Sequence, residues 1–327
     1  MIKTISYETI CENIDNEISL CIIGAVHGNE KCGTKAINRI IQEIESGYIQ
    51  LKKGRLHLMP IANPQAYQKD VRFIQRNLNR YFYRKEIKQN YEDYLDNIIC
   101  DFIEKGNVLL DLHSYASKTD GTEEAFVFLS GNDKKEIEYA KNIGVKNFIY
   151  GWQQAFKNAE NKDEEDDKES QGTVEYARLH NITAVTLECG QHLSVTAPYN
   201  AYLAIIKSLI YFDMLDNNSQ AYKEYENINQ INNEAQISIN KEENLLCIRM
   251  QDVYYKNEGD KLFKDWKHFE PVSKGQILAY KNNRNNENNE NLIIAKQDGY
   301  ILLPKLNAVN NGEWFYFGVE SSFENIE

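Results

Sequence analysis

Three short apolar runs, each ending in a polar residue, constrain the fold of this chain more than any other feature. They are "EISLCIIGAVH", "NVLLDLHS" and "NITAVTLECG", at residues 17–27, 107–114 and 181–190. Continuous apolar and β-branched runs of this length are typical of strands that are buried on both faces of a sheet. Between the runs lie segments with helical spacing, such as residues 30–47, where isoleucines recur at positions 37, 40, 41 and 44. This alternation predicts an α/β protein with a mixed sheet flanked by helices.

The character of the sequence changes after about residue 220. Residues 220–236 are polar and rich in asparagine, which favours a linker. Beyond them come short apolar runs separated by turns, and one of these, "AKQDGYIL", contains an Asp-Gly pair that predicts a β-hairpin. We therefore expect an α/β domain over residues 1–220, followed by a linker and a smaller C-terminal all-β domain over residues 221–327.

Two segments have the composition of solvated loops. Residues 158–170 are strongly acidic, and residues 282–291 consist largely of asparagine. We expect loops at both places, and a flap over a binding site is the alternative for the acidic segment.

The charge balance argues against two classes of partner. The chain contains 37 Lys and Arg against 49 Asp and Glu, which gives a formal net charge of -12. Nucleic acids and anionic membranes both require clustered basic side chains, so we expect neither as a partner. Six scattered cysteines without a C-x-x-C pair, and an N-terminus without the pattern of a signal peptide, predict a cytoplasmic protein with reduced thiols. The sequence does not decide whether the chain forms a homo-oligomer.

Polar side chains follow the three apolar runs at the points where strands should end. His27, His113 and Glu188 occupy these places, and Glu30 lies three residues beyond His27. Because the carboxyl ends of parallel strands meet at one edge of a sheet, we expect these side chains to lie close together. Two histidines and one glutamate are a common ligand set for a catalytic zinc ion, and the remaining carboxylate could serve as a general base.

A simpler interpretation exists for each of these residues alone. An H-x-x-E pair occurs by chance, and a histidine or glutamate at a strand end is usually hydrogen-bonded or ion-paired without further function. The convergence of three strand ends favours the metal site.

A series of arginines follows the second predicted strand. Within "NPQAYQKDVRFIQRNLNRYF", residues 63–82, and just beyond it, arginines occupy positions 72, 76, 80 and 84. This spacing also fits the solvated face of a helix, but the Asn-Pro turn and the interleaved "NLN" favour a shaped loop. Arginine can donate two parallel hydrogen bonds to a carboxylate, so the loop predicts a binding site for a small anionic substrate.

With "GAVHGNE", "NPQAY…VRFIQRNLNRYF", "DLHS" and "TLECG" in this order, the chain resembles the succinylglutamate desuccinylase/aspartoacylase family. That family belongs with the zinc carboxypeptidase-like hydrolases. The resemblance implies a zinc carboxypeptidase-like α/β domain in the first 220 residues. It also implies a zinc-dependent amidohydrolase, or deacylase, that cleaves the amide of an N-acyl amino acid or a similar small amide bearing a carboxylate.

The resemblance also assigns roles to individual residues. One zinc ion per chain would be bound by His27, Glu30 and His113. Glu188 matches the catalytic base, and Arg72 matches the arginine that polarises the scissile carbonyl. The positions that match substrate-binding residues are Asn79, Arg80 and, by its spacing from Glu188 alone, Arg178.

The chain departs from the family at two places. Asn77 stands where aspartoacylases have a charged residue, and "LECGQH" at residues 187–192 differs from the corresponding segment of both aspartoacylases and desuccinylases. The acyl group and the amino acid therefore remain open. His192, in the second segment, is a candidate for a supporting role beside the site. Two alternatives to the deacylase are a metallocarboxypeptidase that acts on peptides and a catalytically inactive metal-binding regulatory protein.

Overall fold

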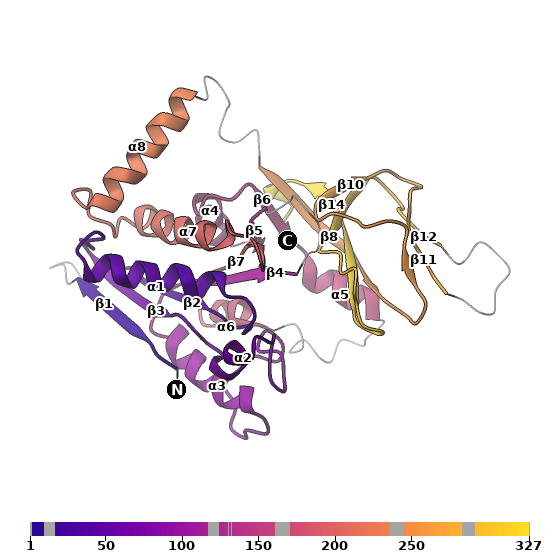
Figure 1. Cartoon of the computed structure of the whole chain (residues 1–327), viewed down its shortest axis with the longest axis horizontal. Coiled ribbons are helices and arrows are strands. Elements are labelled where there is room, and N and C mark those ends of the chain that lie inside the picture. The colour runs from indigo at the N-terminus through magenta and orange to yellow at the C-terminus, as the bar shows by residue number, and fades with distance from the viewer. Residues whose placement is uncertain are drawn as a thin grey trace.

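The computed structural model describes residues 2–9, 17–116, 124–129, 131, 133–160, 171–235, 245–282 and 292–326. In this part of the chain, eleven strands form one mixed sheet (Figure 1). In spatial order they are β1 (Ile5–Thr9), β3 (Gly54–Met59), β2 (Ser19–Gly24), β4 (Val108–Tyr115), β7 (Thr183–Gln191), β5 (Phe126–Leu129), β6 (Asn147–Tyr150), β8 (Leu246–Tyr255), β14 (Glu313–Ser321), β13 (Gly299–Leu302) and β10 (Glu270–Val272).

The three apolar runs form neighbouring strands in the middle of the first half of this sheet. β2 pairs in parallel with β3 and β4, and β4 pairs in parallel with β7. All residues of β2 and β4 are buried, as expected for strands that are covered on both faces. Because these strands run in the same direction, their polar ends lie at one edge of the sheet.

Helices cover both faces of the parallel strands (Figure 1). One face carries α1 (Cys32–Glu45), α4 (Lys134–Asn142) and α7 (Ala197–Tyr211), and the other carries α2 (Pro64–Lys69), α3 (Tyr91–Ile103) and α6 (Thr173–Leu179). The alternation of side chains along β2 supplies both layers, since Leu20 and Ile22 join one hydrophobic cluster while Cys21 and Ile23 join the other. The predicted α/β architecture with a mixed sheet is confirmed.

The polar stretch that was predicted to be a linker is helical. α8 (Gln220–Ala235) begins after Ser219, whose Oγ accepts a hydrogen bond from the backbone N–H of Tyr222 at 3.3 Å. Ala221 is buried, and Tyr222 and Tyr225 pack against the core, so the first two turns are held by apolar contacts that composition alone did not indicate. Figure 1 shows the rest of the helix standing away from the body of the molecule.

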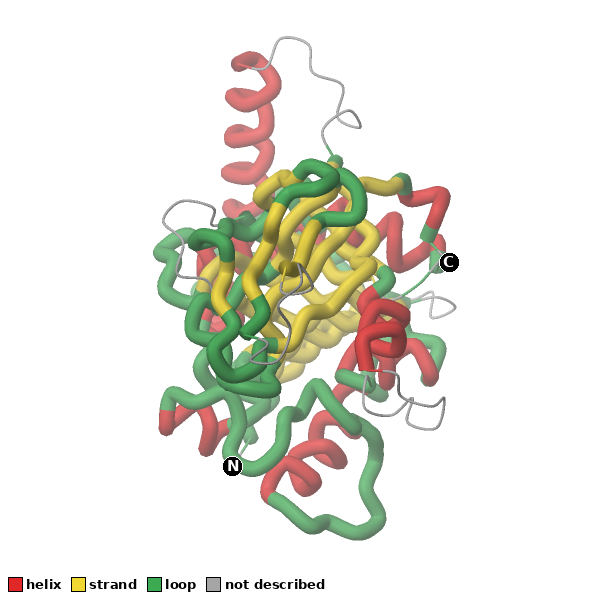
Figure 2. Tube along the Cα trace, turned by 90° about the vertical axis from the view of Figure 1, so that its right-hand side faces the viewer, coloured by secondary structure: helices red, strands yellow, loops and turns green. Residues whose placement is uncertain are grey.

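The C-terminal strands extend the large sheet. β8 pairs in parallel with β6 and antiparallel with β14. α5 (Trp152–Glu160) follows β6 and packs against β8. A second, three-stranded sheet consists of β12 (Leu292–Ile294), β11 (Ile277–Tyr280) and β9 (Lys261–Leu262). Viewed from this end of the molecule, the strands gather in the centre and the helices lie around them (Figure 2).

The hairpin predicted at "AKQDGYIL" is not formed. β12 pairs with β11 in the small sheet, whereas β13 pairs with β10 and β14 in the large one. Gly299 lies inside β13, and a Cβ added there would come within 2.4 Å of the carbonyl oxygen of Gly318. The Asp-Gly pair therefore carries the chain from one sheet to the other and allows a close approach of two backbones.

Two predictions fall mainly outside the described residues. The acidic loop or flap lies at residues 158–170, of which 161–170 are not described, and the asparagine-rich loop lies at 282–291, of which 283–291 are not described. None of the helices in the described ranges is long and apolar enough to pass through a membrane. The division into domains at residue 220 remains a prediction.

Candidate metal centre and active site

The three predicted metal ligands lie together at the carboxyl ends of β2 and β4. Nδ1 of His27 lies 2.9 Å from Oε1 of Glu30, and Nδ1 of His113 lies 2.7 Å from Oε2 of the same carboxylate. One potential ligand atom from each residue lies within 4.8 Å of the other two, and all three side chains are buried. Among the described residues, this is the group of His, Cys, Asp and Glu that is compact enough to hold a metal ion.

The other ring nitrogens of the two histidines are held by oxygens of the protein. Nε2 of His27 lies 2.8 Å from Oδ1 of Asn77, and Nε2 of His113 lies 2.9 Å from Oδ2 of Asp111. An oxygen partner at one ring nitrogen fixes the tautomer and turns the lone pair of the other nitrogen toward a metal. Both Nδ1 atoms lie beside the carboxylate of Glu30 in this way. The donor set and its supports fit a zinc ion.

Glycine allows the loop that carries His27 and Glu30 to pack closely. A Cβ added to Gly28 would come within 2.1 Å of the backbone of Ala66 in α2, and the N–H of Gly28 donates to the carbonyl oxygen of Arg72 at 3.1 Å. The glycine of "HGNE" therefore joins the metal-binding loop to the arginine loop.

Glu188 lies beside His113 as its register partner between β4 and β7. Its Oε2 is buried without a hydrogen-bond partner among the described residues. Burial raises the pKa of Glu188 to about 8, and the neighbouring carboxylate of Glu30 adds to this effect. A carboxyl group with such a pKa can take up and release a proton near neutral pH, as a general acid or base must.

The arginine series forms the shaped loop that was predicted, without helical structure over residues 70–90. The carboxylate of Glu92, at the start of α3, accepts hydrogen bonds from the backbone N–H groups of residues 74, 75 and 76 at 2.8, 3.1 and 3.2 Å. Arg76 pairs with Asp96 at 2.6 Å, and Arg84 pairs with Asp101 at 2.7 Å. These two arginines therefore hold the loop in place.

Arg72 and Arg80, the other two arginines, line the candidate site. Nη1 of Arg72 donates to Oε1 of Glu30 at 2.8 Å, while 46% of the Arg72 side chain is exposed. Nη2 of Arg80 lies 3.3 Å from Oε1 of Glu313, far along the chain in β14. Arg72 thus lies beside the metal cluster, and Arg80 lies against the C-terminal strands.

Asn79 and His192 support their neighbours. Nδ2 of Asn79 lies 3.2 Å from Nε2 of His113, and its Oδ1 accepts a hydrogen bond from the backbone N–H of Thr173 at 3.3 Å. Nδ1 of His192 lies 2.9 Å from Oγ of Ser114, the residue that follows His113. Both residues therefore contact the segment that carries His113 rather than the metal-binding atoms.

Arg178 is not brought to this site. Its Nε lies 3.3 Å from Oε2 of the buried Glu136, and it lines a separate hollow together with Lys135 and Asn181. Its assignment rested on spacing along the sequence, and its position in α6 turns it toward α4 instead. We therefore leave Arg178 out of the candidate site.

A cavity of about 270 Å³ contains the candidate residues. His27, Arg72, Asn79, Arg80, His113 and Glu188 all line it. Sequence reasoning missed the part of the wall that comes from α5, from the loop between β13 and β14 and from β14: Trp152, Phe156, Leu303, Lys305, Glu313 and Tyr316.

Glu313 organises the C-terminal part of this wall. Its Oε2 accepts from Nζ of Lys305 at 2.7 Å and from the hydroxyl of Tyr316 at 2.6 Å, and its Oε1 lies 3.3 Å from Nη2 of Arg80. Burial raises the pKa of Glu313, but Lys305 and Arg80 outweigh burial and lower it to about 2. Glu313 is therefore a carboxylate at neutral pH. In the sequence, the only feature that could have pointed to this residue is the single glutamate within the apolar segment "NGEWFYFG".

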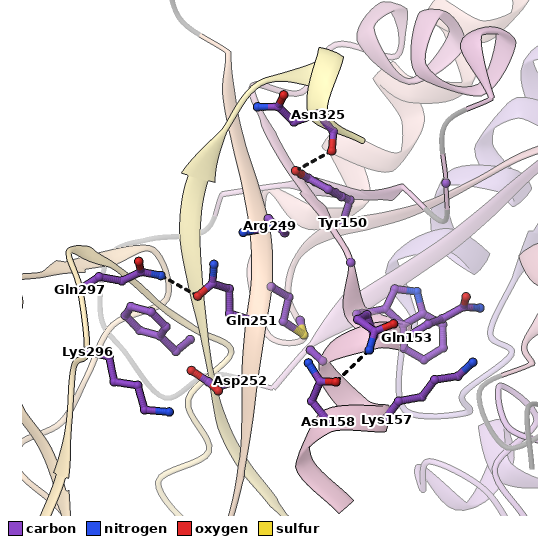
Figure 3. A pocket seen from close by; sticks show the side chains of 17 residues that line it. Tyr150, Gln153, Lys157, Asn158, Arg249, Gln251, Asp252, Lys296, Gln297 and Asn325 are labelled. Atoms are coloured by element: carbon purple, nitrogen blue, oxygen red, sulfur yellow. Dashed lines mark hydrogen bonds between the residues drawn. The ribbon is translucent and has the colours of Figure 1, made fainter. Parts of the chain in front are cut away.

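A second hollow, of about 660 Å³, lies between α5, β8 and residues 296–297 (Figure 3). Figure 3 shows Gln153, Arg249, Gln251 and Lys296 around it. Trp152 and Met250 line both this hollow and the smaller cavity. None of the candidate metal or catalytic residues lines the hollow, so the site belongs to the smaller cavity.

Comparison with known proteins supports a common origin for this arrangement. The model of the succinylglutamate desuccinylase/aspartoacylase catalytic domain matches residues 16–204. A succinylglutamate desuccinylase of Vibrio parahaemolyticus is 34% identical over 115 residues, which cover 32% of this chain and 33% of that protein. One of Shewanella denitrificans is 43% identical over 58 residues, which cover 18% of this chain and 16% of that protein. The chain thus spans a third or less of the length of these curated relatives.

Solved structures share the fold at low sequence identity. A succinylglutamate desuccinylase/aspartoacylase of Rhodobacter sphaeroides has a TM-score of 0.67 at 13% identity, and the match covers 94% of this chain and 87% of that chain. The ectoine utilization protein EutE (DoeB) of Ruegeria pomeroyi has a TM-score of 0.63 at 18% identity, with 93% and 86% covered. The fold is therefore that of the desuccinylases and aspartoacylases, and this chain belongs to the succinylglutamate desuccinylase/aspartoacylase family.

Proposed function

We propose that the protein is a zinc-dependent deacylase that hydrolyses the amide bond of an N-acyl amino acid or a similar small amide with a carboxylate. One observation supports this above all others. His27, Glu30 and His113 present a compact ligand set, and Glu188 stands beside His113 at the same edge of the sheet. The family to which the chain belongs consists of deacylases, which suggests the class of reaction. The two imidazoles and the carboxylate fit a zinc ion.

In this proposal His27, Glu30 and His113 hold the metal, with Asn77 and Asp111 orienting the two imidazole rings. A zinc ion bound there would supply Lewis-acid polarisation and make a nearby water more acidic.

The chain's own groups perform the proton transfers. Glu188 takes a proton from the water whose oxygen bonds to the amide carbon. As the carbon–nitrogen bond breaks, Glu188 gives that proton to the leaving nitrogen. The raised pKa of Glu188, caused first by burial, suits both halves of this exchange.

Arg72 faces the carbonyl oxygen on which negative charge develops. Only Nη1 is engaged by Glu30 at 2.8 Å, and a guanidinium has further N–H donors in the same plane. Arg80 holds the substrate carboxylate, and Asn79, which lies beside His113, keeps Thr173 in position through its Oδ1.

The C-terminal strands favour a small substrate over a peptide. Leu303, Lys305, Glu313 and Tyr316 cover one side of a cavity of about 270 Å³, which suits a small molecule better than an extended chain. We accordingly assign residues 1–220 to the catalytic part and residues 221–327 to a part that closes the cavity. A carboxypeptidase would need this side to be open.

A hydrolysis screen tests the proposal. The full chain is loaded with zinc and incubated with N-acetyl, N-succinyl and N-formyl amino acids and with short peptides, and the released amino acid is measured. Release from the acylated amino acids is expected. Release from peptides alone would favour the carboxypeptidase, and no release from any compound would favour a metal-binding regulatory protein.

A further inference from the structure

We infer that the substrate carries one carboxylate and a bulky apolar group, preferably aromatic, instead of the two or three carboxylates of an acylated aspartate or a succinylated glutamate. This inference deepens the proposed function and rests on it. Two features of the cavity carry it, namely the pairing of its cations and the aromatic wall around Arg80.

The cations of the cavity are already paired with carboxylates of the chain. Arg80 and Lys305 share Glu313, at 3.3 and 2.7 Å, and Arg72 pairs with Glu30 at 2.8 Å. The hydroxyl of Tyr316 also donates to Glu313, which strengthens the position of that carboxylate in the wall.

One net positive charge therefore remains in the part of the cavity around Glu313. Arg80 and Lys305 contribute two positive charges, and Glu313 removes one of them. A single substrate carboxylate can be matched there, whereas a second one would meet Glu313 without a cation of its own.

Aromatic rings form the wall on which such a carboxylate would lie. Trp152 and Phe156 meet edge to face with their ring centroids 5.8 Å apart, and Phe156 lies 6.0 Å from the ring of Tyr316. Cζ of Arg80 lies 5.8 and 5.6 Å from the ring centroids of Trp152 and Phe156. Arg80 is thus framed by rings and oriented by them.

Further apolar side chains line the same cavity. The cavity is also lined by Tyr115, Phe128, Met250 and Leu303. Apolar surface of this extent gains most from a ligand group that removes it from water, and aromatic rings add favourable edge-to-face contacts. A carboxylate placed against it would lose hydration without gaining a hydrogen-bond donor. The wall accepts an apolar group from either side of the amide.

The test compares substrates that differ in these two properties. For the zinc-loaded full chain, kcat/KM is measured for N-acetyl-phenylalanine, N-benzoyl-glycine, N-acetyl-aspartate and N-succinyl-glutamate. We expect one or both aromatic compounds to exceed the two polycarboxylates by at least about tenfold. Equal or faster hydrolysis of the polycarboxylates would overturn the inference and leave the proposed function intact.

A binding measurement separates the inference from the chemistry. In the zinc-loaded Glu188→Gln variant, calorimetry should give a Kd for N-acetyl-phenylalanine at least about tenfold below that for N-acetyl-aspartate. This preference, combined with a lack of hydrolysis by the unmodified protein, would contradict the proposed function while supporting the substrate class. The reverse preference would contradict the substrate class.

Two variants test the two features separately. Glu313→Gln releases Arg80 and Lys305 from their shared carboxylate, so the ratio of kcat/KM for N-acetyl-aspartate to that for N-acetyl-phenylalanine should rise by about tenfold or more. Phe156→Ala should lower kcat/KM for N-acetyl-phenylalanine by about tenfold, while Tyr94→Ala, an exposed aromatic residue on α3, should leave it unchanged.

If both variants fold and the ratio of kcat/KM for N-acetyl-aspartate to that for N-acetyl-phenylalanine is unchanged in each, the inference is wrong. If Glu313→Gln does not fold, Lys305→Met provides the opposite change, since it removes a positive charge and should lower kcat/KM for N-acetyl-aspartate more than for N-acetyl-phenylalanine. An equal effect on both substrates would contradict the pairing argument.

Discussion

His113 and Glu188 face each other across β4 and β7 as partners in the parallel register. His113 brings Nδ1 to within 2.7 Å of Glu30, and the half-buried Glu188 places its buried Oε2 at the same level of the sheet. A candidate metal ligand and the proposed proton acceptor are therefore placed side by side by ordinary strand pairing.

Substitution of Glu188 by glutamine should separate metal binding from turnover. The amide keeps the shape of the side chain but cannot accept the proton of water, so we expect kcat to fall by about 10²–10⁴-fold. The zinc content, measured by elemental analysis, should stay at one ion per chain. Glu138→Gln, on the exposed face of α4, is the matched control and should retain full activity. Undiminished turnover by Glu188→Gln would remove this residue from the mechanism.

The pH dependence of kcat/KM should show the ionisation of Glu188. Burial raises its pKa from 4.5 to about 8, so the carboxylate that acts as base forms as the pH rises through this range. Arg72 already opposes this rise, and a bound metal ion would favour the charged form further and place the midpoint between these two values. We therefore expect kcat/KM to rise with pH over an acidic limb. A profile that is flat from pH 4.5 to 8 would show that another group controls the proton transfer.

Asn77 should matter for metal affinity more than for substrate binding. Its Oδ1 lies 2.8 Å from Nε2 of His27 and accepts the backbone N–H of Asn79 at 2.9 Å. Removal of this oxygen by Asn77→Ala should weaken zinc binding by about 10- to 100-fold, measured by competition with a chelator. Asn142→Ala on α4 provides a control that lies far from the metal ligands. Zinc affinity equal to that of the unmodified protein would contradict this role.

Arg80 and Arg178 should behave differently although the family resemblance pointed to both. Arg80→Ala removes a cation from the cavity wall and should raise KM by about tenfold or more. Arg178→Ala disrupts only the contact with Glu136 outside the cavity and should leave KM within about twofold. The comparison requires steady-state kinetics with one good substrate. A large rise of KM in Arg178→Ala, with the fold intact by circular dichroism, would return that arginine to the site.

The proximity of the candidate metal ligands was predictable because their geometry follows from local patterns. Continuous apolar runs specify buried parallel strands, and parallel strands bring their ends to one edge. His27, His113 and Glu188 needed no knowledge of long-range packing beyond this. The shaped loop around Arg72 could likewise be predicted from its Asn-Pro turn and its asparagines.

The C-terminal half of the cavity could not be found in this way. Glu313 meets Arg80 across 233 positions of sequence, and their contact depends on the pairing of β8 with β6, which no local pattern specifies. Arg178 shows the limit of spacing as evidence, since a spacing along the chain does not fix the direction in which a helical side chain points. The Asp-Gly turn was also misleading, because a turn signal does not reveal that the strands on either side belong to different sheets.

The parallel pairing of β6 with β8 has a consequence for any attempt to shorten the protein. A fragment that stops at residue 220 would retain the candidate metal ligands and the proposed proton acceptor. It would also leave β6 as an exposed edge strand that could pair with another molecule. This truncation would also remove Lys305, Glu313 and Tyr316 from the wall of the cavity and expose Trp152 and Phe156. We therefore expect that residues 1–220 and residues 221–327 depend on each other for stability and that neither is an independent domain.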